Sequence, residues 1–306
     1  MKREKRLIEQ RTNDSWNYEL YEIEAGERYV VIDSYLLEEE TVVIPEEVDG
    51  VKVKEIGSYA FRGKKIKEVM VPKTVDTIGS HAFYDCRSLE KLFITDELVE
   101  VADGAFKNCR SLAWIEIAMT KERYTCLKNL LSEMNQKINC YIHRPFGDVK
   151  LVFPAYLHNY QENTMARVIN QETYGAGAHY RETITKDGIL YQEYDKYFYL
   201  ASNVDEMEAL YGIALARLEY PYELREEKKQ KYETFIKENW IPMLEWLLKT
   251  GQVEYIKWLG DYEGTSQEDM KTLLDFLQAK EEIELLSEMM RKNQNRFGQK
   301  KKSFLL

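Results

Sequence analysis

The strongest constraint on the fold is a phrase that the chain repeats between residues 53 and 117. Its three copies, which begin at positions 53, 75 and 98, read VKEIGSYAFRGKKIKEVMV, VDTIGSHAFYDCRSLEKLFI and LVEVADGAFKNCRSLAWIEI. An Ala-Phe pair recurs at Ala60, Ala82 and Ala105, so the period is 22 and then 23 residues. A fixed period of this length is typical of a solenoid, in which each repeat forms one coil.

Each copy ends in the pattern L-x-x-I-x-I, whose last residues alternate as the two faces of a β-strand do. One coil cannot cover its own apolar residues, so the coils must stack and place each apolar side chain on its counterpart. We expect one internal column of Phe61, Phe83 and Phe106. At Gly57 and Gly79 we expect a tight bend or a close approach to the next coil. The three apolar sets are Ile66/Val69/Val71, Leu89/Leu92/Ile94 and Leu112/Ile115/Ile117.

The full phrase, I-P-x-x-V-x-x-I-G-x-x-A-F-x-x-C-x-S-L-x-x-I-x-I, resembles the BspA-like leucine-rich-repeat family over about residues 41–118. The first copy departs from it by reading AFRGKKI, without the Cys. The resemblance implies a right-handed solenoid with a parallel sheet on one side. It also implies a role in protein or surface adhesion rather than in catalysis.

Three coils need a cap at each end, because the terminal coils would otherwise expose apolar surface. Upstream, WNYELYEI at 16–23 and RYVVIDSYL at 28–36 flank a Gly-containing turn and predict a hairpin that covers the first coil. Downstream, residues 121–136 carry apolar residues at helical spacing and are followed by the strand-like INCYIHRP at 138–145. We expect this helix and strand to form the second cap.

The second half of the chain has a different pattern, in which pairs of short helices recur 30 residues apart around tight turns. The pairs resemble ankyrin-type hairpins in length and apolar spacing, although the T-P-L-H phrase of that family is missing. The matched positions are Leu244, Trp246, Leu247, Val253, Ile256 and Leu259, then Leu274, Phe276, Leu277, Ile283, Leu286 and Met289.

These patterns divide the chain into four parts. We expect a capped leucine-rich-repeat domain over 1–150, a Tyr/Gly-rich connecting segment over 151–204, an α-helical repeat domain over 205–297 and a flexible tail over 298–306. The predicted fold class is therefore α+β: a short right-handed leucine-rich-repeat solenoid (BspA-like) with N- and C-terminal caps, followed by an α-helical hairpin-repeat domain.

Charge and hydropathy limit the partners. The net charge of −10 disfavours nucleic acid, because a phosphate-tracking surface needs an excess of basic groups. The N-terminus lacks the apolar core of a signal peptide and no 18-residue apolar run follows, so we expect a cytoplasmic protein without a membrane segment. In that reducing compartment the four cysteines are expected to be thiols.

Chemical motifs are sparse, so we predict no catalytic residues, no metal site and no cofactor. Cys86 and Cys109 share a repeat position, but no second pair at C-x-x-C spacing completes a zinc site. The segment GAGAHYRE at 175–182 is the one local arrangement with the character of a ligand site. There the amides of Gly175 and Gly177 would bind an anion beside His179 and Arg181. A Gly-rich hinge between domains explains the same residues.

The outward positions of the predicted strands give the sharper hypothesis. If Leu89, Leu92 and Ile94 point inward, other strand residues face outward and form a docking patch for a protein partner. The alternative is that the cap helix or the C-terminal helices cover this patch. We therefore predict a non-enzymatic interaction or scaffold protein. The alternatives are a small-ligand, anion-binding or enzymatic site in the middle segment near His179 and Arg181, or a cell-surface adhesin. The predicted partner-binding residues are Met70, Phe93, Trp114, Lys91 and Glu116, with Phe93 between Met70 and Glu116 and Trp114 beside Lys91.

Overall fold

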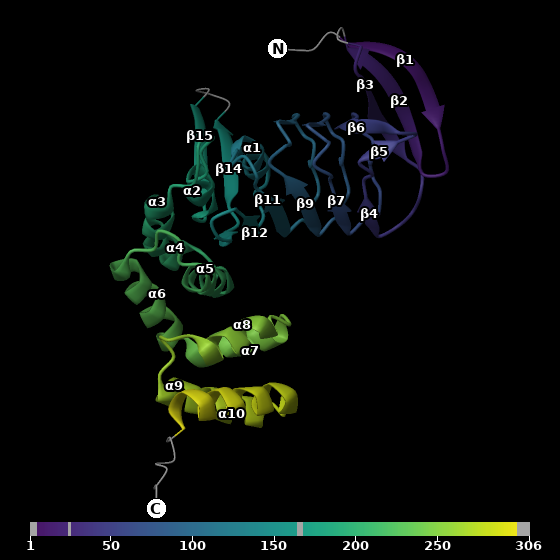
Figure 1. The fold of residues 1–306 in the computed structure, drawn as a ribbon. Coiled ribbons are helices and arrows are strands. Elements are labelled where there is room, and N and C mark those ends of the chain that lie inside the picture. The colour runs from purple at the N-terminus through teal and green to yellow at the C-terminus, as the bar shows by residue number, and fades with distance from the viewer. Residues whose placement is uncertain (1–4, 24–25, 164–167, 299–306) are drawn as a thin grey trace, which may run out of the picture. The chain divides into compact units, whose positions relative to one another are not determined.

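The computed structural model describes residues 5–23, 26–163 and 168–298. The chain forms two compact units, Met1–Leu210 and Tyr211–Leu306 (Figure 1). The first unit contains the repeats and also the segment 151–204, which the sequence predicted to be a connection between domains.

The repeats build a β-solenoid whose main sheet has one strand from each turn. Its parallel strands are β4 (Thr41–Val43), β7 (Glu68–Met70), β9 (Lys91–Thr95), β11 (Trp114–Ala118) and β12 (Ile138–His143). The antiparallel strand β13 (Val149–Phe153) completes this sheet beside β12. A second sheet contributes the short parallel strands β6 (Val51–Ile56), β8 (Thr77–Ile78) and β10 (Glu100–Val101), and β5 (Glu47–Val48) pairs with β6.

The solenoid is longer than the three predicted coils. The strand at 138–143, which we expected to belong to a cap, is the fifth parallel strand of the main sheet. The helix before it, α1 (Thr125–Glu133), packs against β10 and therefore forms the back of the last turn. The sequence missed this turn because the helix replaces the Ala-Phe phrase.

The N-terminal hairpin covers the first turn, as predicted. Strands β2 (Trp16–Ile23) and β3 (Arg28–Tyr35) are antiparallel, and β3 continues the second sheet through parallel pairing with β6. An additional strand, β1 (Lys5–Thr12), pairs with β2 at the edge. Inside, the rings of Trp16 and Tyr35 lie 6.1 and 5.5 Å from the ring of Phe61, so the hairpin extends the aromatic column of the repeats.

The core of the solenoid repeats from coil to coil. Phe61, Phe83 and Phe106 are buried and stack in order, which confirms the predicted column. A Cβ on Gly57 would lie 2.8 Å from the carbonyl oxygen of Ile32, and one on Gly79 would lie 2.9 Å from the main chain of Gly57. These glycines are therefore needed for close approach between adjacent turns.

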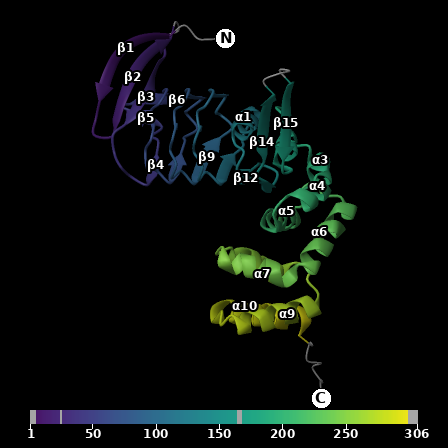
Figure 2. The same cartoon turned by 180° about the vertical axis from the view of Figure 1, so that it is seen from behind.

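Residues 151–204 follow the last turn and belong to the first unit. They form the hairpin β14 (Leu157–Asn163) and β15 (Val168–Tyr174), then α2 (Gly177–Glu182), α3 (Tyr191–Lys196) and α4 (Phe198–Val204) (Figure 1 and Figure 2). The hydroxyl of Tyr194 accepts a hydrogen bond from the amide of Val152 and donates one to its carbonyl, at 2.9 and 2.7 Å. This pair of bonds fixes α3 to the edge strand of the main sheet.

The helical region begins with α5 (Met207–Glu219), which continues from the first unit into the second. It is followed by α6 (Glu226–Glu238), α7 (Trp240–Lys249), α8 (Val253–Asp261), α9 (Gln267–Ala279) and α10 (Ile283–Phe297). The predicted helix pairs are α7/α8 and α9/α10, and their turns both use a left-handed residue, Gly251 and Glu281. The predicted tail lies outside the described residues from position 299 onward. Buried positions 30 residues apart are Trp246/Phe276, Leu247/Leu277 and Leu259/Met289.

Candidate functional site

The outward face of the main sheet is the first candidate site, and its residues form two rows. Pairing between strands places Val43, Met70, Phe93, Glu116 and Tyr141 in one row. The neighbouring row contains Thr41, Glu68, Lys91, Trp114 and Asn139. The structure therefore brings the predicted residues together in the predicted order.

The first row presents apolar side chains at three adjacent strands. Val43 is 63% exposed and Met70 is 37% exposed, whereas Phe93 is half-buried. Trp114, in the neighbouring row, is also half-buried. The Nζ atom of Lys150, on β13, lies 5.2 Å from the Trp114 ring, close enough for a cation–π contact. A group of exposed and half-buried Val, Met, Phe and Trp side chains on one sheet face is typical of a binding surface.

Charged groups border this apolar group. Lys91 forms an ion pair with Glu68 at 2.6 Å, and both side chains are partly exposed. The predicted cap helix α1 packs against β10 and α2, on the side of the second sheet. It therefore does not cover the outward face of the main sheet.

A group of hydrogen-bonded side chains around His143, at the β12 end of the face, was not predicted from the sequence. The Nε2 atom of His143 lies 2.8 Å from a Glu116 carboxylate oxygen, and its Nδ1 atom lies 3.3 Å from a carboxylate oxygen of Asp148. The Tyr141 hydroxyl donates to the same Asp148 carboxylate at 2.8 Å. A signal was available, because NCYIH at 139–143 alternates as WIEIA at 114–118 does.

The predicted anion site has a different arrangement from the one expected. Arg181 is buried, and its guanidinium donates to the carbonyl oxygens of Pro154, Gly177 and Gln136 at 2.7, 2.9 and 2.5 Å. Burial lowers the pKa of Arg181 to about 10. These three hydrogen bonds hold the guanidinium against the main chain of the first unit.

The other residues of the predicted anion site also have internal roles. The amide of Ala176, between the two glycines, donates to the carboxylate of Asp205 at 3.1 Å. The imidazole of His179 is half exposed and stacks on the Tyr197 ring at 5.3 Å. A Cβ on Gly177 would lie 2.1 Å from the carbonyl oxygen of Pro154, so this glycine allows close packing. The anion site gains no support from these contacts.

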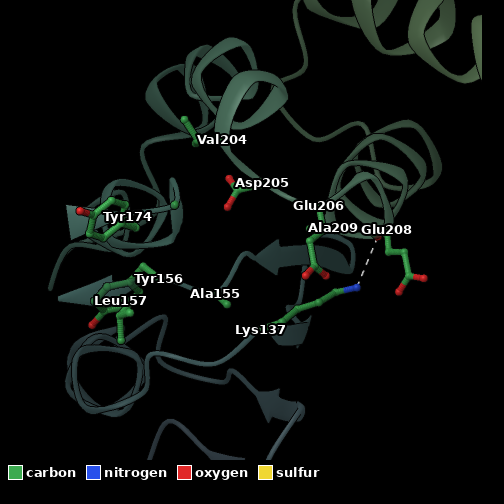
Figure 3. A pocket seen from close by; sticks show the side chains of 11 residues that line it. Lys137, Ala155, Tyr156, Leu157, Tyr174, Val204, Asp205, Glu206, Glu208 and Ala209 are labelled. Carbon is green, nitrogen blue, oxygen red and sulfur yellow. Dashed lines mark hydrogen bonds between the residues drawn. The ribbon is translucent and has the colours of Figure 1, made fainter. Parts of the chain in front are cut away.

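A cavity of about 340 Å³ lies beside this segment, and it is the second candidate site (Figure 3). It is open to solvent and is lined by the residue before β12, the β13–β14 connection, the end of β15 and the turn between α4 and α5. Gly175 is the one predicted ligand residue that lines it. The ionisable side chains that line it are Lys137, Tyr156, Tyr174, Asp205, Glu206 and Glu208.

Membrane-spanning helices and metal-ligand clusters are both absent from the described ranges. Within residues 5–23, 26–163 and 168–298, none of the helices combines the length and apolar character that a membrane span requires. In the same part of the chain, no three His, Cys, Asp or Glu side chains are grouped as metal ligands would be.

The stacked turns, with one parallel strand each, define a leucine-rich-repeat β-solenoid followed by a helical region. Residues 40–140 match the BspA type leucine rich repeat region in six copies. The match confirms the resemblance of the repeats and extends beyond the 41–118 that the repeated phrase indicated. Proteins with these repeats commonly mediate protein–protein interaction and are typically non-enzymatic.

Solved structures of bacterial leucine-rich-repeat proteins are similar to the repeat region. One from Bacteroides capillosus is 25% identical, covers 37% of this chain and 89% of its own, and has a TM-score of 0.32. One from Bacteroides ovatus is 28% identical, covers 35% of this chain and 31% of its own, and has a TM-score of 0.30. The T. pallidum leucine-rich-repeat protein is 20% identical, with coverages of 35% and 71% and a TM-score of 0.24. A comparison with curated proteins finds no match.

Proposed function

We propose that this protein is a non-enzymatic interaction protein that binds a protein partner through the outward face of its main sheet. The docking face is defined by Val43, Met70, Phe93 and Trp114, with Lys91 and Glu116 at its border. The observation that carries the proposal is that Val43 and Met70 are exposed and Phe93 and Trp114 are half-buried on the outward face of one sheet, with Val43, Met70 and Phe93 at paired register positions.

The chemistry of the face fits a protein partner. Aromatic and Met side chains supply most of the binding energy at protein interfaces when a partner removes them from water. Phe93 and Trp114 are half-buried before binding, so their side chains lose little conformational freedom when a partner binds. The Lys91–Glu68 pair and the Glu116–His143 contact give a polar rim that orients the partner.

The test compares the wild-type protein with a Phe93→Glu/Trp114→Glu variant as baits in the native lysate. We expect the variant to lose the captured partner while its circular dichroism spectrum is unchanged. The matched control is Leu190→Glu/Tyr199→Glu, which places two charges on exposed residues away from the sheet. Capture of the same proteins by all three baits would show that the docking face is not used.

A second variant distinguishes a loss of binding from a loss of folding. Val43→Glu/Met70→Glu changes the two most exposed side chains of the face, so it removes little packing. A photo-crosslinking residue at position 93 should attach to the same partner in the wild-type background. Performing the capture separately on cytosolic and cell-surface fractions distinguishes an intracellular scaffold from an adhesin.

A further inference from the structure

The cavity beside the β14–β15 hairpin contains a lysine in an unusual environment. The Nζ atom of Lys137 donates to the main-chain carbonyl of Glu208 at 3.4 Å. Burial lowers the pKa of Lys137, and the nearby carboxylates of Glu208 and Glu206 only partly oppose this effect. Hydrogen bonds to carboxylates raise the pKa of Lys91 and of Lys257, which are the reference lysines for the test below.

Proton-transfer groups lie in the same cavity. The Asp205 and Glu206 side chains extend into the space between Tyr156, Tyr174 and Lys137 (Figure 3). Burial raises the pKa of Asp205, as does the charge of Glu206, although the hydrogen bond from the Ala176 amide opposes the increase. A carboxyl group with a raised pKa can exchange a proton near neutral pH more readily than an ordinary aspartate.

We propose that Lys137 is a nucleophilic amine that forms a Schiff base with a small carbonyl compound bound in this cavity. The neutral Nζ atom adds to the carbonyl carbon, so a C–N bond forms, the C=O π bond breaks, and the oxygen gains one proton while Nζ loses its first, which gives a carbinolamine. Loss of a second Nζ proton and of the hydroxyl group as water then gives the imine. The reaction consumes no oxidant or reductant. Asp205 and Glu206 are the groups that transfer these protons.

The lining of the cavity selects the class of carbonyl compound. Tyr156, Leu157, Tyr174 and Val204 provide aromatic and aliphatic walls, and a volume of about 340 Å³ fits a small molecule. The carboxylates of Asp205, Glu206 and Glu208 repel an anion. The expected ligand is therefore a neutral aldehyde or ketone with an apolar or aromatic body, and a keto acid or a phosphorylated aldehyde is disfavoured.

The test is reductive trapping in the wild-type protein. Benzaldehyde and cyanoborohydride are added at pH 7.5, and the modified lysines are mapped and quantified by mass spectrometry over time. We expect Lys137 to be modified on the order of tenfold faster than Lys91 or Lys257, which serve as internal controls. Its rate should saturate with benzaldehyde concentration, and glyoxylate, an anionic aldehyde, should label it more slowly than benzaldehyde does.

Variants then separate a reactive amine from a ligand site. Lys137→Met should abolish the fast labelling, Asp205→Asn should slow it, and Asp187→Asn, an exposed aspartate away from the cavity, should leave it unchanged. The proposal is overturned if Lys137 is labelled no faster than Lys91. It is also overturned if the rate rises linearly with benzaldehyde, because a linear rate means that no complex forms in the cavity.

Discussion

The phenyl ring of Phe83 stacks on that of Phe61, one turn earlier, with centroids 4.7 Å apart and planes inclined by 11°. On its other side, the Phe106 ring lies 5.0 Å away at 8°. Phe83 is fully buried between two identical neighbours, so it is the central contact through which three turns of the solenoid share one core.

Phe83→Ala should therefore destabilise the solenoid by about 3–5 kcal/mol, since it removes a buried ring and leaves a cavity between turns. Hydrogen exchange measured peptide by peptide should show the loss of protection across residues 53–118. Phe146→Ala, at a ring that is 81% exposed, is the control and should change protection by less than about 0.5 kcal/mol. Equal effects of the two substitutions would contradict the stacked-column account.

The repeated phrase predicts those parts of the fold in which successive coils place the same type of side chain at the same position. The Cys86 thiol donates to the carbonyl of Phe61 at 3.0 Å, and the Cys109 thiol donates to that of Phe83 at 3.1 Å. In the first coil the position belongs to Lys64, whose ammonium donates to the carbonyl of Leu37 at 3.2 Å. Lys64, which replaces the Cys of the family phrase, is therefore also a hydrogen-bond donor to a main-chain carbonyl.

The last turn and the cavity could not be predicted in the same way. α1 replaces the repeated phrase in the last turn, so periodicity ends although the parallel sheet continues to β12. The cavity depends on segments that are distant in sequence, and a lysine such as Lys137 has no local pattern that distinguishes it from an exposed one. The outward rows of the sheet were predictable, because strand alternation alone fixes which residues face away from the core.

Asp96 gives a prediction about pH. Its carboxylate is fully buried and accepts hydrogen bonds from the amides of Thr120, Lys121 and Arg123 at 2.9, 2.6 and 3.3 Å, and from the Thr120 hydroxyl. Burial alone would raise the pKa of Asp96, but these donors hold it below its usual value. The carboxylate therefore fixes the segment that leads into α1.

Asp96→Asn should cost on the order of 2 kcal/mol at pH 7, because an amide group would face donors that now meet a charged acceptor. The carboxylate contributes stability that is complete above its unfolded pKa, near 3.9, and is lost as the pH falls through the lowered folded pKa. The difference between the two proteins in urea unfolding should thus be constant from pH 7 to 5 and shrink below pH 4. Asp187→Asn, at an exposed site, should show no such difference at any pH.

Arg181 provides a prediction that separates a structural role from anion binding. Its guanidinium forms three hydrogen bonds to carbonyl oxygens from separate segments, and lysine cannot reproduce this geometry. Arg181→Lys should therefore destabilise the first unit by about 2–3 kcal/mol. Increasing phosphate should raise the thermal unfolding midpoints of the wild-type and the variant proteins by the same amount. Selective stabilisation of the wild-type protein by phosphate would instead support the predicted anion site.

The start of α9 offers a prediction for the helical region. Ser266 accepts a hydrogen bond from the amide of Asp269, whose carboxylate accepts one from the amide of Ser266, so both ends of a capping box are present. Ser266→Ala removes one acceptor from the exposed helix end and should cost about 1 kcal/mol. Ser266→Asp keeps an acceptor and a favourable charge at the helix N-terminus, so it should retain most of the stability. Hydrogen exchange of residues 267–279 measures both effects, and equal protection in the alanine and aspartate variants would show that the cap does not stabilise α9.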